Sequence, residues 1–306
     1  MKHAIDPKVD CVFKALLGRE SNYALLINFL NAFLLPDLTQ PISEVEILNP
    51  YLEQEFIGDK LSIVDVKARN RNGQLHQIEI QLLIKPWLRE RIVHNWAKLL
   101  SQQLHEGEDY ERIRPTYSIW LLGDDLLPDD LVVHRYKLRD ENAQPLSDHG
   151  GIWLLELNKF NPDTPIRADD ERWLKFFREG EQLDDEHLPD WMQTNPMRQA
   201  MDTLRTFSEK EREYHLYLGR QEFLYSQRSE EMRAQRVAQS LLLEQALRKE
   251  AEQAREEAER EREKADKKRE EAEQGREEER RMREEAEQRE AQLLSELARL
   301  RQGAKE

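Results

Sequence analysis

The sequence contains a single cysteine, Cys11, among its 306 residues. One cysteine excludes an internal disulfide framework and any zinc site that needs several thiolates, so we expect Cys11 to be a small core residue. No stretch reaches the ~18–20 consecutive apolar residues of a membrane span, and the charged N-terminal segment lacks the apolar core of a signal peptide. We therefore expect a cytoplasmic protein with no membrane partner.

Apolar residues are also scarce, at 38% of the chain, whereas charged residues make up 36%. Residues 230–306 hold 19 Lys/Arg and 23 Asp/Glu, which leaves 28 and 39 for residues 1–229, a net charge of −11. Such an acidic body argues against strong indiscriminate binding of phosphates, which depends on many Lys/Arg contacts. An enzyme acting on nucleic acid would therefore need a local basic cleft.

Proline is absent after residue 229, where the composition changes to Glu, Arg, Gln, Lys and Ala. We expect a globular domain over residues 1–228, with a core at about 8–125 and an extension at 126–228. The remainder, residues 229–306, is expected to be a separate charged helical tail.

The tail carries a thin heptad seam. Its members, seven residues apart, are Ala251, Ala258, Ala265, Ala272, Glu279, Ala286, Leu293 and Leu300. The second seam position, three residues further on, is charged in three of six cases; it reads Ala254, Glu261, Lys268, Gly275, Met282 and Arg289. The tail could therefore be a weak coiled coil that joins copies of the chain, or a lone solvated helix held by Glu–Arg pairs. The positive and negative charges of the tail nearly cancel, so binding of nucleic acid by the tail is a third and weaker hypothesis.

The periodicity of apolar residues predicts the order of the elements in the body. We expect two helices within 8–35, a strand at 41–49, paired strands at 61–69 and 74–84, a helix over 86–107, a buried strand at 116–123, further strands within 129–157 at the sheet edge or in a small extension, and helices from 169. This order indicates an α/β fold in which helices cover a mixed sheet.

The turn between the paired strands decides whether Asp65 and Glu79 meet. A two-residue turn sends the two acids to opposite faces of the hairpin. A three-residue turn with Gly73 in the left-handed conformation pairs Asn70 with Gln74 and places Asp65 opposite Glu79. Directly opposed residues have Cβ atoms roughly 4.5–5.5 Å apart, close enough for both carboxylates to bind one divalent cation.

The surroundings of the two acids also favour a cation site. Asp65 lies in "IVDV" and Glu79 in "IEIQ", so Ile and Val flank both. A solvated surface pair is not expected in such apolar strands, although acids do face each other by chance in a chain with 62 of them. Like charges placed this close raise a pKa unless a cation neutralises them.

Several segments are similar in order and spacing to one known family. They are "DCVFKALLG" followed by "LLINFLNAFL", then "LSIVDVKARNRNGQLHQIEIQ", "RERIVHNWAKLLSQQLHEGEDY" and "PTYSIWLL". Over about residues 4–225 the chain resembles the PD-(D/E)XK nuclease superfamily, specifically its recombination-promoting nuclease or transposase branch, in which Gln replaces the Lys of the motif. The resemblance implies a restriction-endonuclease-like αβββαβ core and a DNA endonuclease that uses Mg²⁺ or Mn²⁺.

The resemblance also implies roles for individual residues. Asp65 and Glu79 match the metal carboxylates, and the carbonyl of Ile80 is a further possible ligand. Asp10 matches an acid of the first helix, although it could equally be the N-cap of that helix. A divalent cation held there would activate water for attack on a phosphodiester and offset the developing charge.

Gln81 occupies the Lys position. An amide can orient water but supplies no charge, so the positive charge must come from another residue. Lys67 projects from the same strand face as Asp65, and Arg91 opens a polar stripe on the following helix. A lysine that reaches into solvent and an ordinary solvated helix face are the alternatives. We expect the three histidines nearest these segments, His76, His94 and His105, to be non-catalytic.

Two functions follow from these observations. The first is a metal-dependent DNA endonuclease associated with transposition or recombination. The second is a catalytically weak or inactive nuclease fold that serves as a binding or assembly module through its tail. The missing Lys, the acidic body and the long tail support the second.

Overall fold

The computed structural model describes residues 1–48, 51–52, 62–63 and 65–303, and the side chains of residues 1–48 and 65–295. The chain divides into two compact units, Met1–Arg228 and Ser229–Glu306. Within the described ranges, none of the helices has the length and apolar character needed to cross a membrane.

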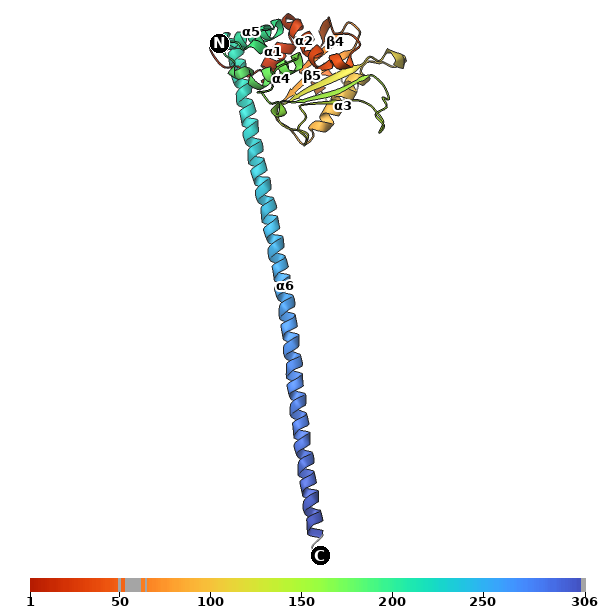
Figure 1. The fold of residues 1–306 in the computed structure, drawn as a ribbon, viewed down its shortest axis with the longest axis vertical. Helices are drawn as coiled ribbons and strands as arrows, with labels where there is room; N and C mark the ends of the chain where they lie inside the picture. The colour runs from red at the N-terminus through yellow and green to blue at the C-terminus, as the bar shows by residue number, and fades with distance from the viewer. Residues whose placement is uncertain (49–50, 53–61, 64, 304–306) are drawn as a thin grey trace. The chain divides into compact units, whose positions relative to one another are not determined.

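A six-stranded mixed sheet forms the centre of the first unit, with strand order β1-β4-β5-β6-β8-β7 (Figure 1). The strands are β1 Val45–Leu48, β4 Val66–Asn70, β5 Leu75–Gln81, β6 Thr116–Leu122, β7 Val133–Tyr136 and β8 Gly150–Glu156. β1, β4 and β5 are antiparallel neighbours, β5, β6 and β8 run parallel, and β7 closes the edge in the antiparallel direction. A separate two-stranded sheet joins β2 Tyr51–Leu52 to β3 Ser62–Ile63.

Helices cover both faces of the six-stranded sheet. The helices of the unit are α1 Asp10–Leu17, α2 Tyr23–Leu34, α3 Leu88–Ser101, α4 Asp169–Glu179 and α5 Asn195–Glu209. Short 3₁₀ helices occupy Glu20–Asn22, Leu35–Asp37, Tyr110–Arg112, Leu157–Lys159, Gly180–Gln182 and Asp190–Met192. α1, α2, α4 and α5 share the main apolar core with one sheet face, whereas α3 packs on the other face in a smaller cluster. Because successive side chains of a strand alternate between faces, β6 and β8 contribute residues to both clusters.

The element order confirms the αβββαβ core: α1, then β1, β4 and β5, then α3 and β6. One expectation needs correction. The strands within 129–157 were expected at the sheet edge or in an extension, yet β8 lies inside the sheet between β6 and β7. The reason is its composition, because nearly every residue of "GIWLLE" is buried, as in strands covered on both faces.

The last helix, α6 Glu211–Gly303, contributes its first turns to the first unit, where Tyr217 is buried. The same helix forms the described part of the second unit. From residue 232 to residue 295 every side chain is exposed. The expected helical tail is therefore present as a single continuous helix.

Candidate functional site

The β4–β5 turn contains three residues. The N–H of Asn70 donates to the carbonyl of Gln74 at 3.0 Å, and the N–H of Gly73 donates to the carbonyl of Asn70 at 3.0 Å. Gly73 has φ +78°, the left-handed conformation in which a side chain is strained. The three-residue turn is therefore confirmed, and the two-residue alternative is wrong.

This turn sets the register that brings the two acids together. Val66 lies opposite Ile78, so the next pair along the hairpin is Asp65 and Glu79. Asp65 is a bend residue rather than a strand residue, and β4 begins only at Val66. The side chain of Asp65 makes the contact with β5 instead, because its Oδ2 accepts the N–H of Ile80 at 2.9 Å.

Glu79 is a buried acid with only 2% of its surface exposed. Its Oε1 accepts hydrogen bonds from Gln77 at 3.1 Å and Asn95 at 3.3 Å, and its Oε2 lies 3.1 Å from Arg91. Burial first, and the charge of Asp65 second, raise the pKa of Glu79 from 4.5 to about 8. The three polar partners offset this effect only in part. Glu79 therefore holds its proton more readily than an ordinary glutamate does.

Two cations approach the pair from helices on opposite sides of the sheet. Lys14 of α1 lies 3.1 Å from Asp65 Oδ1, with 44% of its side chain exposed. Arg91 of α3 lies beside Glu79, with 30% of its side chain exposed. The sequence reasoning missed Lys14, although its spacing of four residues from Asp10 in "DCVFK" places both on one helix face.

Arg91 also contacts the residue that replaces the family's Lys. Its Nη1 donates to Gln81 Oε1 at 3.1 Å, and its guanidinium lies over the ring of Trp120 at 5.4 Å from the centroid. The amide nitrogen of Gln81 donates to the carbonyl of Leu83 at 2.8 Å. Gln81 and Glu79 therefore share one guanidinium, and both ends of the Gln81 amide are bonded.

The structure brings Asp10 to the same region. Asp10 is the first residue of α1, and Val9 precedes it as the N-cap, so the N-cap alternative for Asp10 is wrong. A cavity of about 200 Å³ is lined by Asp10, Ile80 and Gln81 among others. Arg220 of α6 also lines it, and its Nε lies 3.7 Å from Asp10 Oδ2.

Lys67 lies further along the hairpin. It pairs with Gln77 rather than Glu79 in the strand register. Its side chain lines a different cavity, of about 470 Å³, together with Arg69 and Arg114. The two candidate cations named from the sequence therefore occupy different places, and only Arg91 contacts Glu79 and Gln81.

His76 occupies the opposite sheet face from Glu79, as its odd spacing predicts. It is fully buried and stacks on Tyr117 with ring centroids 5.3 Å apart. Burial lowers the pKa of His76 to about 3, so its ring is neutral at physiological pH.

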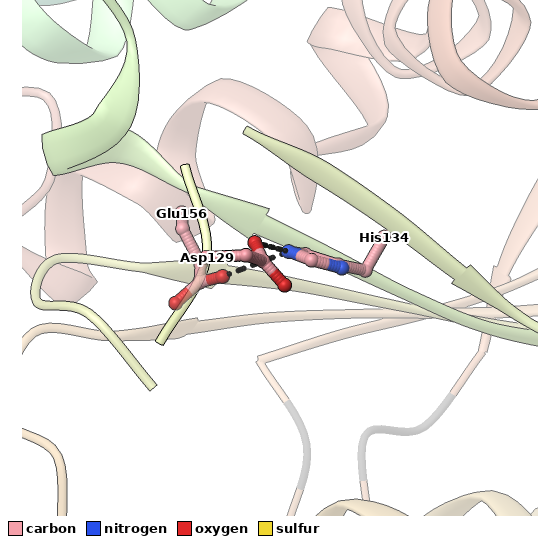
Figure 2. Close-up of side chains that lie close together, drawn as sticks. All are labelled: Asp129, His134 and Glu156. Carbon is pink, nitrogen blue, oxygen red and sulfur yellow. Dashed lines mark ion pairs between the residues drawn. The ribbon is translucent and has the colours of Figure 1, made fainter. Parts of the chain in front are cut away.

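A second group of acids lies at the carboxyl end of β8. Figure 2 shows Asp129, His134 and Glu156, whose ligand atoms all lie within 4.8 Å of one another. His134 Nε2 is 3.2 Å from Asp129 Oδ1 and 3.1 Å from Glu156 Oε2. Among the residues whose side chains are described, these three offer a carboxylate, an imidazole and a second carboxylate close enough to bind one metal ion. The sequence reasoning did not identify this group. In the sequence, this group is indicated by an acid, Glu156, at the end of an apolar strand.

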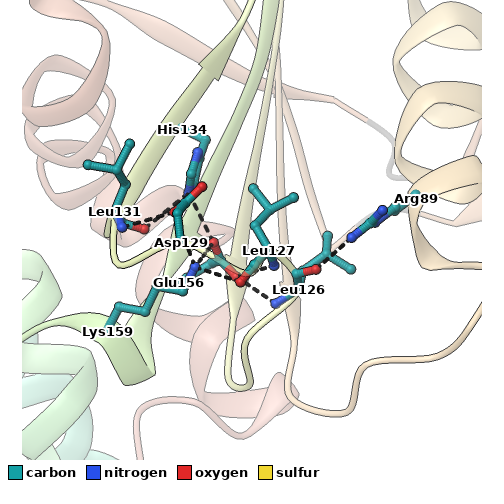
Figure 3. Close-up of polar contacts among 8 residues, drawn as sticks. All are labelled: Arg89, Leu126, Leu127, Asp129, Leu131, His134, Glu156 and Lys159. Carbon is teal, nitrogen blue, oxygen red and sulfur yellow. Dashed lines mark hydrogen bonds and ion pairs between the residues drawn. The ribbon is translucent and has the colours of Figure 1, made fainter.

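A lysine already balances the charge of this second group (Figure 3). Lys159 Nζ lies 2.8 Å from Glu156 Oε2 and 3.5 Å from Asp129 Oδ1, and only 6% of the Lys159 side chain is exposed. Glu156 Oε1 accepts the N–H groups of Leu126 at 2.6 Å and Leu127 at 3.0 Å. The acceptors of Glu156 are therefore satisfied by the chain itself.

Comparison with known proteins gives one match. Residues 7–234 match the PD-(D/E)XK nuclease family transposase. The matched range includes the β4–β5 hairpin, α3 and both groups of acids. Neither a curated protein nor a solved structure matches the chain.

Proposed function

Because the chain belongs to the PD-(D/E)XK nuclease family transposase group, we propose that it is a metal-dependent DNA endonuclease centred on Asp65 and Glu79. The observation that carries the proposal is the buried Glu79 opposite Asp65 across the hairpin, where burial first and the charge of Asp65 second raise the pKa of Glu79. Two acids held across a hairpin at the cost of mutual repulsion are expected where a cation binds. The family membership assigns the chain a nuclease role associated with transposition, and the hairpin supplies a centre for it.

The donors at this centre suit a hard divalent cation. The carboxylates of Asp65 and Glu79 would hold Mg²⁺ or Mn²⁺, and the carbonyl of Ile80 is the nearest backbone candidate for a further ligand. The cavity that joins Asp10 to Ile80 and Gln81 supports a part for Asp10 as an additional acid. Such an ion lowers the pKa of water and stabilises negative charge on a phosphate.

The protein's own cations would supply the charge that Gln81 lacks. Arg91 is held by Glu79 and Gln81 at 3.1 Å each, and its planar guanidinium is suited to a phosphate. Gln81 acts here as a positioning residue, because its amide accepts a hydrogen bond from Arg91 and donates one to the carbonyl of Leu83. Lys14 would offset charge on the Asp65 side. Lys67 pairs with Gln77 in the strand register and lines the cavity of about 470 Å³, so its place is on the path of the DNA rather than beside Glu79.

Nicking of supercoiled plasmid tests the proposal. Full-length protein is incubated with Mg²⁺ or Mn²⁺, and the loss of supercoiled DNA is followed over time. We expect Asp65→Asn and Glu79→Gln each to lower the rate by at least about 100-fold, since removing an essential charge-stabilising group costs several kcal/mol. The matched control is Asp129→Asn, which removes an acid from the second group and should keep the wild-type rate.

Two results would overturn the endonuclease proposal. One is a wild-type protein that leaves the plasmid intact with either ion. The other is nicking that persists unchanged in Asp65→Asn or Glu79→Gln, because the activity would then arise elsewhere or from a contaminant.

We infer a second function, assembly of copies of the chain through α6. The supporting observation is a run of large apolar residues in the tail that are more than half exposed: Val237, Leu241, Leu242, Leu243 and Leu247. Leu243 and Leu247 fall on the helix face that continues through Ala251 and Ala254 at spacings of four and three. A stripe of this kind is buried when two helices pair as a coiled coil.

Light scattering on the full chain tests the assembly function. We expect a mass of at least two chains for the wild type and of one chain for the double variant Leu243→Glu/Leu247→Glu. The matched control, Glu252→Gln/Glu259→Gln, alters exposed tail positions away from the seam without adding charge. A single-chain mass for the wild type, or an unchanged multimer in the Leu double variant, would contradict this function.

A further inference from the structure

The cavity that contains Lys67 has a basic lining in a body with a net negative charge. It measures about 470 Å³ and lies where the β4–β5 turn meets the C-terminal end of α3. Its charged lining residues are Lys67, Arg69, Arg112 and Arg114, with His105 beside them, and among the residues that the structure describes none of those lining it is acidic. We call this surface the basic groove. It provides the local basic cleft that a nucleic-acid enzyme with an acidic body needs.

The arginines of the basic groove are only weakly neutralised. Arg69 lies 4.0 Å from Glu46, and both side chains are largely exposed, so the pair contributes little. Arg114 donates to the backbone carbonyl of Glu111 at 3.0 Å, which holds the side chain without cancelling its charge. Arg112 pairs with Glu108 at the exposed rim. Arg69 and Arg114 therefore keep most of their positive charge in the groove.

The groove has a fixed frame. The side chain of Gln103 accepts the N–H of Arg114 at 2.9 Å and donates to the carbonyl of the same residue at 2.9 Å. Its amide also donates to Thr116 Oγ1 at 2.8 Å, at the start of β6. Arg114 packs across the turn near Gly73. Charges mounted on such a frame are pre-organised for an extended anionic ligand.

The groove continues the face on which the two acids lie. Lys67 and Arg69 follow Asp65 by two and four residues, so all three project from one face of the hairpin. At ~3.3 Å per residue, Arg69 lies roughly 13 Å from Asp65 along β4. That length is about four base-pair steps of ~3.4 Å. A DNA strand with one phosphate at the acid pair would therefore place later phosphates over the groove.

We infer that the basic groove binds the phosphodiester backbone of DNA on one side of the Asp65–Glu79 centre. The inference rests on the proposed endonuclease function and names the path of its substrate. Each arginine that neutralises a phosphate releases a counterion, so its loss lowers the salt dependence of binding. Contacts of this kind position the duplex and carry no sequence preference.

The experiment measures binding without cleavage. Full-length protein is titrated in EDTA against a fluorescent 30-base-pair duplex at several salt concentrations between 50 and 250 mM. The test variant is Arg69→Gln/Arg114→Gln. The matched control, Arg167→Gln/Arg198→Gln, removes two exposed arginines at the start of α4 and on α5, which pack on the other sheet face. Thermal unfolding establishes that each variant is folded.

We expect the slope of log K against log salt to fall by about 1.8 in the test variant, since each lost phosphate contact removes about 0.9. The Kd at 100 mM salt should rise at least tenfold, whereas the control should keep both values. A wild-type chain that binds no duplex at 50 mM salt, or a test variant that matches the control, would overturn the inference.

Nicking by the same proteins separates this inference from the proposed function. If the wild type nicks plasmid and the test variant binds DNA as the control does, the groove assignment fails and the endonuclease stands. If the groove variant loses binding but no protein nicks plasmid with any ion, the endonuclease fails and the groove stands as a DNA-binding surface.

Discussion

Glu79 and Glu156 are both buried acids on the same face of one sheet, yet their surroundings differ in kind. Gln81, Leu122 and Glu156 lie side by side across β5, β6 and β8. Glu79 lies two residues before Gln81 on β5 and so projects from the same face. Glu156 has a nearly buried Lys159 and two backbone N–H groups as partners. Glu79 has amide partners, an arginine with 30% of its side chain exposed, and a second acid across the hairpin.

The difference shows which buried acids are available to a ligand. Glu156 completes a closed network that also ties the loop at 126–127 to α3, because Arg89 donates to the carbonyl of Leu126 at 2.8 Å (Figure 3). We therefore infer that the Asp129–His134–Glu156 group stabilises the fold, although its residues are of the types that bind metals. Glu79 is held by the partly exposed Arg91, and burial first, with the charge of Asp65 second, raises its pKa.

The largest expected effect comes from breaking the closed network. Lys159→Met keeps the length of the side chain but leaves Glu156 without its cation, and breaking a buried ion pair costs about 3–5 kcal/mol. We expect thermal unfolding of the first unit to shift down by roughly 6–20 °C. The matched change at the other acid pair, Lys14→Met, should shift it far less because Lys14 is 44% exposed. Equal shifts would contradict the distinction between the two groups.

The second effect is the pH dependence of cation binding at Glu79. Because the pKa of Glu79 is about 8, a cation must displace its proton at lower pH. We expect the affinity for Mn²⁺ to rise by up to about tenfold per pH unit between pH 6 and 7.5 and to level off above pH 8. Isothermal titration calorimetry measures it. An affinity that does not change over this range would show that Glu79 is not a ligand.

The third effect concerns stability without metal. Since the folded-state pKa of Glu79 lies above the unfolded value, the folded chain keeps a proton that the unfolded chain releases, and stability falls as pH rises from about 4.5 through 8. Glu79→Gln removes this pH-dependent loss of stability. In EDTA we expect the variant to unfold roughly 2–8 °C higher than the wild type at pH 8.5 and close to it at pH 5. Glu209→Gln, at an exposed position, should show no such pH-dependent gain.

The smallest effect is that of Lys14 on the cation. An ammonium group 3.1 Å from Asp65 competes with a divalent ion for that carboxylate. Lys14→Met should therefore raise Mn²⁺ affinity by up to about fivefold, in keeping with the modest energy of a part-exposed ion pair, while lowering the nicking rate. Lys210→Met is the control at an exposed position. A change of both quantities in the same direction would argue against this role.

The sequence predicts well the features that depend on residues close together in the chain. The Gly73 turn, the pairing of Asn70 with Gln74 and hence the opposition of the two acids follow from turn chemistry and the period of a strand. The αβββαβ order follows from apolar periodicity in the same way. Both depend on residues close in the chain, where spacing alone determines which side chains meet.

Contacts between distant segments were beyond such reasoning. Nothing in the spacing relates Lys14 on α1 to Asp65 or Lys159 to Asp129, because these contacts depend on how helices pack on the sheet. The position of β8 inside the sheet was missed for the same reason, since an apolar run does not specify its neighbours. The sequence also could not separate Arg91 from Lys67, because the packing of α3 on the sheet brings Arg91 to Glu79, whereas Lys67 lines the basic groove.

The central claim, that Asp65 and Glu79 bind a divalent cation whereas the Asp129–His134–Glu156 group does not, is tested most directly by Mn²⁺ binding at pH 8. Electron paramagnetic resonance counts the bound ions on the full chain. We expect one site in the wild type, at least tenfold weaker in Asp65→Asn and Glu79→Gln and unchanged in Asp129→Asn and His134→Gln. Binding that survives the first two changes and is lost in the last two would contradict the account.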